Sequence, residues 1–519
     1  MRKKYDIIIL ILSLIFNYIS LNKKKTALEI ARDIGIGYNL GNTFDSYNNI
    51  KEIKNPDDQI TLLGNVVPTR DMICNIKKCG FKTIRIPVTW MNFMDDLGII
   101  NSEWMSRVKE VVDWIISLNM YCILNIHHDG KSGNWLSEGL KTKDKYANLW
   151  TQIAKEFNIY DEHLIFESMN EIQFLINNNY DYQTLLYLSQ VFVDTIRNEG
   201  GNNANRLLLI SGANADIDLT CSLQFKLPND PSNTLAVSIH YNYLPQFTKE
   251  PDDNPWVYYD EVYKYFYTMQ PFTQWGSEDD YKNMVADFEL LKNTFIDKGI
   301  PIIISEIGVL TEQKKEIQSI RDFLYFAFTL SADYDGIVSC LWDTSKKGIG
   351  DMNYYNREEN NWYDRNMRDY FKKISKGKYV SPMEFYIIKD YEKIENVDYD
   401  GNFNLNIKNR EVQNVIFNAK ILTNQFGAIG FGVVSVNKNG IWFSEPITGT
   451  VGKKQYNGSY TFTIDATNKD YNNYIQIQKW WGLENIIFNY FSLEFKVKFN
   501  SFDYKSYKGN FSYLINLYS

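Results

Sequence analysis

Two glutamates, Glu171 and Glu306, each follow a short apolar run, and the two runs lie far apart in the chain. The runs read His163-Leu-Ile-Phe-Glu-Ser-Met-Asn-Glu171 and Pro301-Ile-Ile-Ile-Ser-Glu306. An unpaired charge at the end of a buried strand is costly, so packing alone does not explain a carboxylate there. Two carboxylates in equivalent settings predict one active site, and such a pair can perform acid/base and nucleophilic catalysis on a glycosidic bond.

Other polar residues near the ends of apolar runs extend this candidate site. The chain has four histidines, and His127, His128 and His240 occupy such positions. Arg85 lies in a further run, where a fixed guanidinium can hold a nearby carboxylate ionised and oriented. A salt bridge at the rim of the fold is the structural alternative for this arginine.

Trp342, Asn170 and Asn39 have side chains suited to binding a sugar. Trp342 ends the run Ser339-Cys-Leu-Trp342, where its ring can form a floor for a pyranose; core packing is the alternative. Asn170 directly precedes Glu171 and can donate a hydrogen bond to a sugar hydroxyl in the transition state. Asn39 lies at the end of the first apolar run, so we include it in the candidate site.

Eight apolar runs, most of them separated by stretches of helical period, predict how these residues are brought together. Apolar strands that alternate with helices indicate a parallel sheet, and eight such units predict a (β/α)₈ barrel with its chemistry at the carboxyl ends of the strands. We place this barrel at residues 26–376. The predicted strands are Ile34–Leu40, Thr83–Val88, Tyr121–Ile126, Leu164–Met169, Leu207–Ser211, Leu235–Ile239, Ile302–Ser305 and Ile337–Leu341.

One connection in this pattern, residues 241–281, is far longer than the others. Connections beyond ~15 residues in a compact domain are usually functional or disordered. This one contains Trp256 and Trp275 among many tyrosines and prolines. We therefore expect it to line the substrate, with Trp275 as a binding residue.

The composition excludes some classes of partner. The chain has 519 residues, a net charge of −8 and 15% aromatic residues. A nucleic-acid partner would require a basic stripe, which this balance argues against. The five cysteines show no disulfide framework and no metal-binding spacing. We expect no cofactor, no metal and a monomer.

The two ends of the chain differ from the central part. Residues 1–22 combine a basic head with an apolar core, which predicts a secretory signal peptide, with an uncleaved anchor as the alternative. We therefore expect a secreted protein with no other membrane contact. Residues 377–383 read as a linker. Residues 384–519 alternate short strand-like runs with Asn/Gly turns, which predicts an all-β, sandwich-like domain that could be a carbohydrate-binding module.

Six ordered motifs within residues 26–376 resemble glycoside hydrolase family 5 cellulases. Within that family they look nearest to the endoglucanases and xyloglucanases of anaerobic bacteria and gut fungi. The motifs are Gly37-Tyr-Asn-Leu-Gly-Asn-Thr43, Gly80-Phe-Lys-Thr-Ile-Arg-Ile-Pro-Val-Thr-Trp90, Leu124-Asn-Ile-His-His-Asp129, Met169-Asn-Glu171, Gly299-Ile-Pro-Ile-Ile-Ile-Ser-Glu306 and Leu341-Trp-Asp343.

This resemblance implies retaining hydrolysis of plant cell-wall β-glucan by double displacement. It assigns Glu171 as the acid/base and Glu306 as the nucleophile, and it places Arg85, His127, His240 and Trp342 around them. For these roles we expect the pKa of Glu171 to be raised by burial and by the neighbouring negative charge, and Arg85 to keep Glu306 ionised. Cellulose, xyloglucan and mixed-linkage glucan are the expected substrates.

One motif departs from the family pattern. The family commonly has His-x-Tyr after the sixth strand, with the tyrosine hydrogen-bonded to the nucleophile. Here the run is His240-Tyr-Asn-Tyr-Leu-Pro245, so Asn242 replaces that tyrosine, and either Asn242 or Tyr243 takes its role. Two alternatives remain open: a β-mannanase or xylanase on the same fold, and a non-catalytic polysaccharide-binding protein.

Overall fold

The computed structural model describes residues 24–47, 53–176, 179–242, 245–249, 275–276, 278–311, 315–345 and 351–378. It also describes the backbone of β9 (Trp256–Asp260) and β10 (Tyr265–Met269), and of β15 to β23 between residues 384 and 498. The predicted signal peptide, most of the linker and Tyr243 lie outside the described residues. In the described part of the chain, no helix is long and apolar enough to cross a membrane.

Eight parallel strands form a closed barrel in the described part of the chain, as the apolar runs predicted. The first strand pairs with both the second and the last, which closes the sheet. Their observed bounds are β1 (Gly37–Asn39), β2 (Thr83–Ile86), β3 (Tyr121–Asn125), β4 (Leu164–Glu167), β7 (Leu208–Ser211), β8 (Leu235–Tyr241), β11 (Ile302–Ile307) and β12 (Ile337–Leu341).

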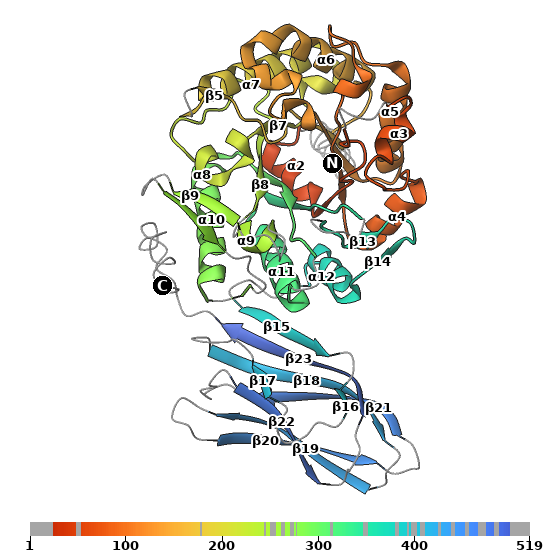
Figure 1. Ribbon diagram of the computed structural model, residues 1–519, viewed down its shortest axis with the longest axis vertical. Coiled ribbons are helices and arrows are strands. Elements are labelled where there is room, and N and C mark those ends of the chain that lie inside the picture. The colour runs from red at the N-terminus through yellow and green to blue at the C-terminus, as the bar shows by residue number, and fades with distance from the viewer. Residues whose placement is uncertain are drawn as a thin grey trace, which may run out of the picture.

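Helices surround this barrel as an outer layer (Figure 1). Helix α10 (Glu278–Thr294) is followed by a 3-10 turn, Ile296–Lys298. Asn119, shortly after α5 (Ser102–Ser117), and Gly299, directly after this turn, both have left-handed φ values, 53° and 83°. The bounds are α3 (Pro56–Ile60), α4 (Arg70–Lys78), α5 (Ser102–Ser117), α6 (Lys143–Glu156), α7 (Tyr182–Asn198), α8 (Ile217–Thr220), α9 (Pro245–Thr248), α10 (Glu278–Thr294), α11 (Ile317–Asp333) and α12 (Arg365–Ser375).

One end of the barrel is filled by apolar side chains, which leaves the other end for polar ones. Helix α2 (Ala27–Ile34) begins at a capping box formed by Thr26 and Glu29. Its apolar face joins residues of the strands in one buried cluster, which includes Ile30, Ile34, Ile123, Ile165, Leu209, Ile303 and Val338. The prediction had Ile34 in the first strand, whereas it is the last residue of this helix.

The strands beyond residue 383 form two antiparallel groups. One has the order β15-β23-β18-β21, with β16 also paired to β23, and the other has the order β17-β22-β19-β20. Their bounds are β15 (Glu384–Tyr391), β16 (Ile394–Glu395), β17 (Asn402–Asn404), β18 (Glu411–Thr423), β19 (Gly427–Val436), β20 (Trp442–Val451), β21 (Tyr456–Asp465), β22 (Tyr474–Trp481) and β23 (Ile487–Lys498). The side chains of this region lie outside the described residues, so a separate sandwich domain stays a prediction.

Candidate active site

Arg85 is the centre of the polar end of the barrel. Its side chain is fully buried and donates hydrogen bonds to two carboxylates. Nη1 lies 2.7 Å from Oε1 of Glu306, and Nε lies 2.6 Å from Oε2 of Glu167. The two carboxylates raise the pKa of Arg85 above its usual range although burial alone would lower it. The guanidinium therefore stays charged and ties β2, β4 and β11 together.

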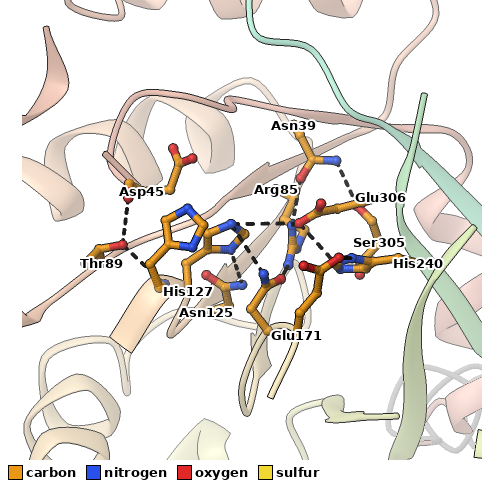
Figure 2. Close-up of polar contacts among 12 residues, drawn as sticks. Asn39, Asp45, Arg85, Thr89, Asn125, His127, Glu171, His240, Ser305 and Glu306 are labelled. Atoms are coloured by element: carbon orange, nitrogen blue, oxygen red, sulfur yellow. Dashed lines mark hydrogen bonds and ion pairs between the residues drawn. The ribbon is translucent and has the colours of Figure 1, made fainter. Parts of the chain in front are cut away.

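Two asparagine amides surround the guanidinium and have fixed orientations. Asn39 accepts from Arg85 Nη1 at 3.0 Å and donates to the carbonyl of Ser305 at 2.8 Å (Figure 2). Asn170 accepts from Arg85 Nη2 at 2.9 Å, so its Nδ2 faces the other way, 3.4 Å from His127 Nε2. Because each amide oxygen is committed to Arg85, each amide nitrogen is aimed at a defined place in the site.

Glu306 lies at an irregularity of its strand. The pairing of β11 with β8 shifts register between Ile304 and Glu306. Such an irregularity re-aims a side chain, and the carboxylate of Glu306 points to Arg85 with 15% of the side chain exposed. Its Oε1 also lies 3.4 Å from His240 Nε2 and 3.9 Å from His127 Nε2.

Glu171 reaches the same place from a loop. It follows the end of β4, Glu167, by four residues, so it does not close the strand itself. Its side chain is 44% exposed, and Oε1 lies 2.8 Å from His240 Nδ1 and 3.7 Å from Lys249 Nζ. His240 therefore stands between the two glutamates, as Figure 2 shows, and one polar atom from each of Glu171, His240 and Glu306 lies within 4.8 Å of the others.

The pKa of Glu171 differs from our expectation. Burial raises it, but the hydrogen bond and charge of His240, with help from Lys249 and His128, more than offset this and hold it well below its usual range. The expected increase required a negative neighbour, whereas the carboxylate turns toward His240 and Lys249. In the ligand-free protein, Glu171 is thus held in its ionised form.

The histidines on the other side of the site favour their neutral forms. His127 is buried, and burial, followed by the neighbouring His128 and Arg85, holds its pKa well below the usual value. Burial also lowers the pKa of His128 to about 4. His128 packs its ring against that of Tyr47, at 5.0 Å between centroids.

Trp342 and His127 form a flat apolar surface beside Glu306. Their rings are stacked, with centroids 5.7 Å apart and an angle of 6° between the planes. Gly41 packs under the indole, since a Cβ at that position would lie 3.0 Å from Trp342 Cζ2 and 2.9 Å from the carbonyl oxygen of Asp343. The indole is only partly buried, and stacking against His127 fixes its plane.

Some predicted site residues lie elsewhere. Only 5% of the surface of Trp275 is exposed, and its ring packs against Phe323 and Phe326 of α11. This buried position corrects the expectation that Trp275 lines the substrate. Asn242 is partly buried, and its carbonyl lies 3.5 Å from Thr248 Oγ1. Tyr243 lies outside the described residues, as does much of the long connection.

The sequence analysis missed Glu167 and Ser238. Glu167 ends β4 with its side chain 1% exposed, and its Oε1 accepts a hydrogen bond from Ser238 Oγ at 2.5 Å. A signal was present, because Glu167 is a charged residue inside an otherwise apolar strand-like run.

Two groups in the site have the composition of metal ligands: Asp45 with His127 and His128, and Glu171 with His240 and Glu306. Most of these groups already have protein partners. The carboxylate of Asp45 accepts from the backbone nitrogens of Asn42 and Thr43, and Glu306 is paired with Arg85. We assign no metal to either group.

The chain is similar to several known proteins. A family model, cellulase (glycosyl hydrolase family 5), matches residues 42–348. Endoglucanase A of Clostridium longisporum is 34% identical over 366 residues, which cover 66% of this chain and 65% of that protein. Endoglucanase A of Paenibacillus barcinonensis is 30% identical over 381 residues, covering 66% of this chain and 88% of that protein. This chain thus spans slightly less than two thirds of the first relative.

Solved structures are similar to about two thirds of the chain. A GH5-4 broad specificity endoglucanase from an uncultured bovine rumen ciliate has 58% sequence identity and a TM-score of 0.66, and the match covers 68% of this chain and 99% of that one. A family 5 xyloglucanase from Paenibacillus pabuli has 30% identity and a TM-score of 0.57, over 67% and 99% of the two chains.

Proposed function

Because the chain belongs to glycoside hydrolase family 5, the cellulase family, we propose that it is a retaining endo-β-1,4-glucanase. Its substrates would be cellulose, xyloglucan or mixed-linkage glucan. The similar solved structures are described as a broad specificity endoglucanase, a lichenase and a xyloglucanase, which supports this substrate class. The plant cell wall would be the source of these polysaccharides.

One observation carries the mechanism: the approach of the two glutamates. Oxygens of Glu171 and Glu306 lie within 4.8 Å of each other and of His240. Retaining glycosidases hold their carboxyl groups ~5–5.5 Å apart, whereas inverting enzymes need ~6.5–9.5 Å to admit a water. The observed spacing favours direct attack by a carboxylate on the sugar.

In the first step, Glu306 attacks the anomeric carbon and forms a glycosyl-enzyme ester. The bond to the leaving oxygen breaks, and Glu171, which must take up a proton from solvent before this step, gives that proton to the leaving oxygen. In the second step, Glu171 takes a proton from water, whose oxygen attacks the anomeric carbon and releases Glu306. Arg85 orients Glu306 for the attack and receives the carboxylate again when the ester breaks, because the buried guanidinium donates a hydrogen bond directly to Glu306 Oε1.

Other residues would hold the sugar during these steps. Trp342, kept flat by His127, would support the face of a pyranose ring. Asn170 Nδ2 would donate to a sugar hydroxyl, because its oxygen is already committed to Arg85.

We further propose that the protein is secreted by its N-terminal segment and acts as a monomer, and that residues 384–519 form a β-sandwich that binds polysaccharide.

The test compares the wild type with Glu171→Gln and Glu306→Gln on carboxymethylcellulose, xyloglucan, lichenan, mannan and xylan. We expect the wild type to act on the first three, and each variant to lose about 10²–10⁴-fold or more in turnover. Glu103→Gln, at an exposed site at the start of α5, is the matched control and should keep wild-type rates. Near-normal turnover in either active-site variant, or activity confined to mannan or xylan, would contradict the proposal.

A further inference from the structure

Glu167 is a third buried carboxylate beside the two proposed catalytic glutamates. It lies at the end of β4, inside the barrel, with 1% of its side chain exposed. Oε2 accepts from Arg85 Nε at 2.6 Å and Oε1 from Ser238 Oγ at 2.5 Å. Ser305 supports this serine, with its Oγ 2.8 Å from that of Ser238. Both carboxylate oxygens of Glu167 thus accept hydrogen bonds from fixed donors.

Glu167 is not placed to touch a sugar. Its exposed fraction is negligible, and both of its oxygens are committed to protein donors. A buried ion pair is costly to desolvate and is weak evidence for stability alone. The position of Glu167 on Arg85 suggests a different role, because the same guanidinium holds Glu306 at 2.7 Å.

The sum of charges shows what Glu167 adds. Arg85 carries one positive charge, which would be fully offset by Glu306 if the two formed an isolated pair. Glu167 brings a second negative charge to the same cation, so the three groups together are negative. In a buried site such charges act strongly on each other, because the effective dielectric constant is low. A net negative charge also stabilises the positive charge that develops on the sugar in an oxocarbenium-like transition state.

We propose that Glu167 is a positioning residue that binds Arg85 together with Glu306. The negative charge of Glu167 offsets the positive charge of Arg85, so the guanidinium orients Glu306 without weakening it as a nucleophile. This inference rests on the proposed role of Glu306 as nucleophile. Ser238 contributes to this arrangement, because its hydroxyl holds Oε1 of Glu167 and thereby keeps Oε2 on Arg85 Nε.

The pH dependence of kcat/KM separates this role from a purely structural one, since its acidic limb follows the ionisation of the nucleophile. The groups that face Glu306 are Arg85, His127, His240, Glu171 and, at longer range, Asp45. The groups that act on Glu167 are Arg85, Ser238 and the thiol of Cys340. A Glu167→Gln variant removes one charge from this set and keeps an acceptor for Arg85 Nε.

For Glu167→Gln we expect the acidic limb of kcat/KM on a soluble β-glucan to move to lower pH by about one unit, because Glu306 then faces Arg85 without a competing carboxylate. We expect kcat to fall about tenfold or more, because the carboxylate that remains is a weaker nucleophile. An acidic limb at the wild-type position, or one moved to higher pH, would overturn the inference.

Ser238→Ala is the matched control. It removes the hydroxyl donor to Glu167 but keeps the charge, so the acidic limb should stay in place or move to higher pH. A shift to lower pH equal to that of Glu167→Gln would show that general disturbance of the site is the cause, and would overturn the inference.

If Glu167→Gln does not fold, Glu167→Asp replaces it. The charge is conserved in this variant, so the acidic limb of kcat/KM should stay in place while kcat falls. A shift to lower pH in this variant would overturn the inference.

The wild type in the same experiment separates the two proposals. A wild type without activity on any β-glucan would contradict the proposed function itself. An active wild type with an unmoved acidic limb in Glu167→Gln would contradict only the role of Glu167.

Discussion

His240 connects the two proposed catalytic glutamates at the scale of single residues. Its Nδ1 lies 2.8 Å from Glu171 and its Nε2 lies 3.4 Å from Glu306. The contact with Glu171 opposes the effect of burial and holds the pKa of that carboxyl below its usual range. A general acid must carry a proton before it can give one, so in the proposed mechanism this contact would restrict activity to the acidic side of the pH range.

His240→Asn tests this reasoning. Removing the imidazole removes the main influence that lowers the pKa of Glu171 and leaves desolvation opposing its charge, so this pKa should rise. The basic limb of kcat/KM follows loss of the proton from the general acid, and we expect it to move to higher pH by about one unit. His163→Asn, at the opposite end of β4, is the control and should leave the profile unchanged. A basic limb that stays in place or moves to lower pH in His240→Asn would disprove the link.

Most residues of the candidate site could be predicted from the sequence, because the parallel strands bring their carboxyl ends to one end of the barrel. Glu171, Glu306, Arg85 and His240 were all found in this way. The direction of the pKa shift of Glu171 could not be found, since it depends on which way a loop side chain turns. Trp275 was misplaced because an aromatic residue in a long connection gives no sign of whether its ring faces substrate or a helix.

At the scale of elements, the seam between β1 and β12 closes the barrel and leaves little room for side chains. Gly37 is in register with Cys340. A Cβ on Gly37 would lie 2.2 Å from Cys340 Sγ, which is far closer than two such atoms can approach. The same strand positions Asn39 two residues later, so the seam and the site depend on each other.

Gly37→Ala should therefore destabilise the barrel by about 1–3 kcal/mol through overpacking. Adding Cys340→Ala removes the clashing sulfur, so the double variant should recover part of the loss. Urea unfolding monitored by circular dichroism gives both values, with Cys340→Ala alone as the reference. A wild-type midpoint for Gly37→Ala, or a double variant no more stable than the single one, would be inconsistent with the packing at this seam.

The eight strands could be predicted because short apolar runs recur along the chain and most have a polar residue at or near their end. Their ends were less certain. Ile34 was assigned to a strand, whereas the capping box at Thr26 starts a helix that extends to it. The register shift in β11 has no sign in the sequence, because it arises where two neighbouring strands are paired.

At the scale of the whole molecule, the candidate site is built within the barrel part of the chain. All of its described residues belong to strands β1 to β12 or to the loops that follow them. The match to one solved relative covers 68% of this chain and 99% of the other. A compact unit with its own core is expected to fold alone.

A chain reduced to residues 24–378 should keep kcat/KM on soluble glucan within about twofold, since the barrel has its own core. It should bind insoluble cellulose more weakly, because the proposed polysaccharide-binding region is gone. Pull-down on insoluble cellulose measures binding, and the full-length Glu306→Gln variant measures it without hydrolysis. A truncated chain that fails to fold, or that binds cellulose as well as the full chain, would refute this division of roles.

The anomeric form of the first product tests the central claim, that Glu306 attacks the sugar and Glu171 supplies and removes the proton. Proton NMR recorded during hydrolysis of a soluble β-1,4-linked glucan follows this form before the two anomers equilibrate. Two displacements at one carbon restore its configuration, so the β-anomer should appear first and the α-anomer later by mutarotation. An α-anomer that appears first would contradict the covalent role of Glu306 and with it the account of this site.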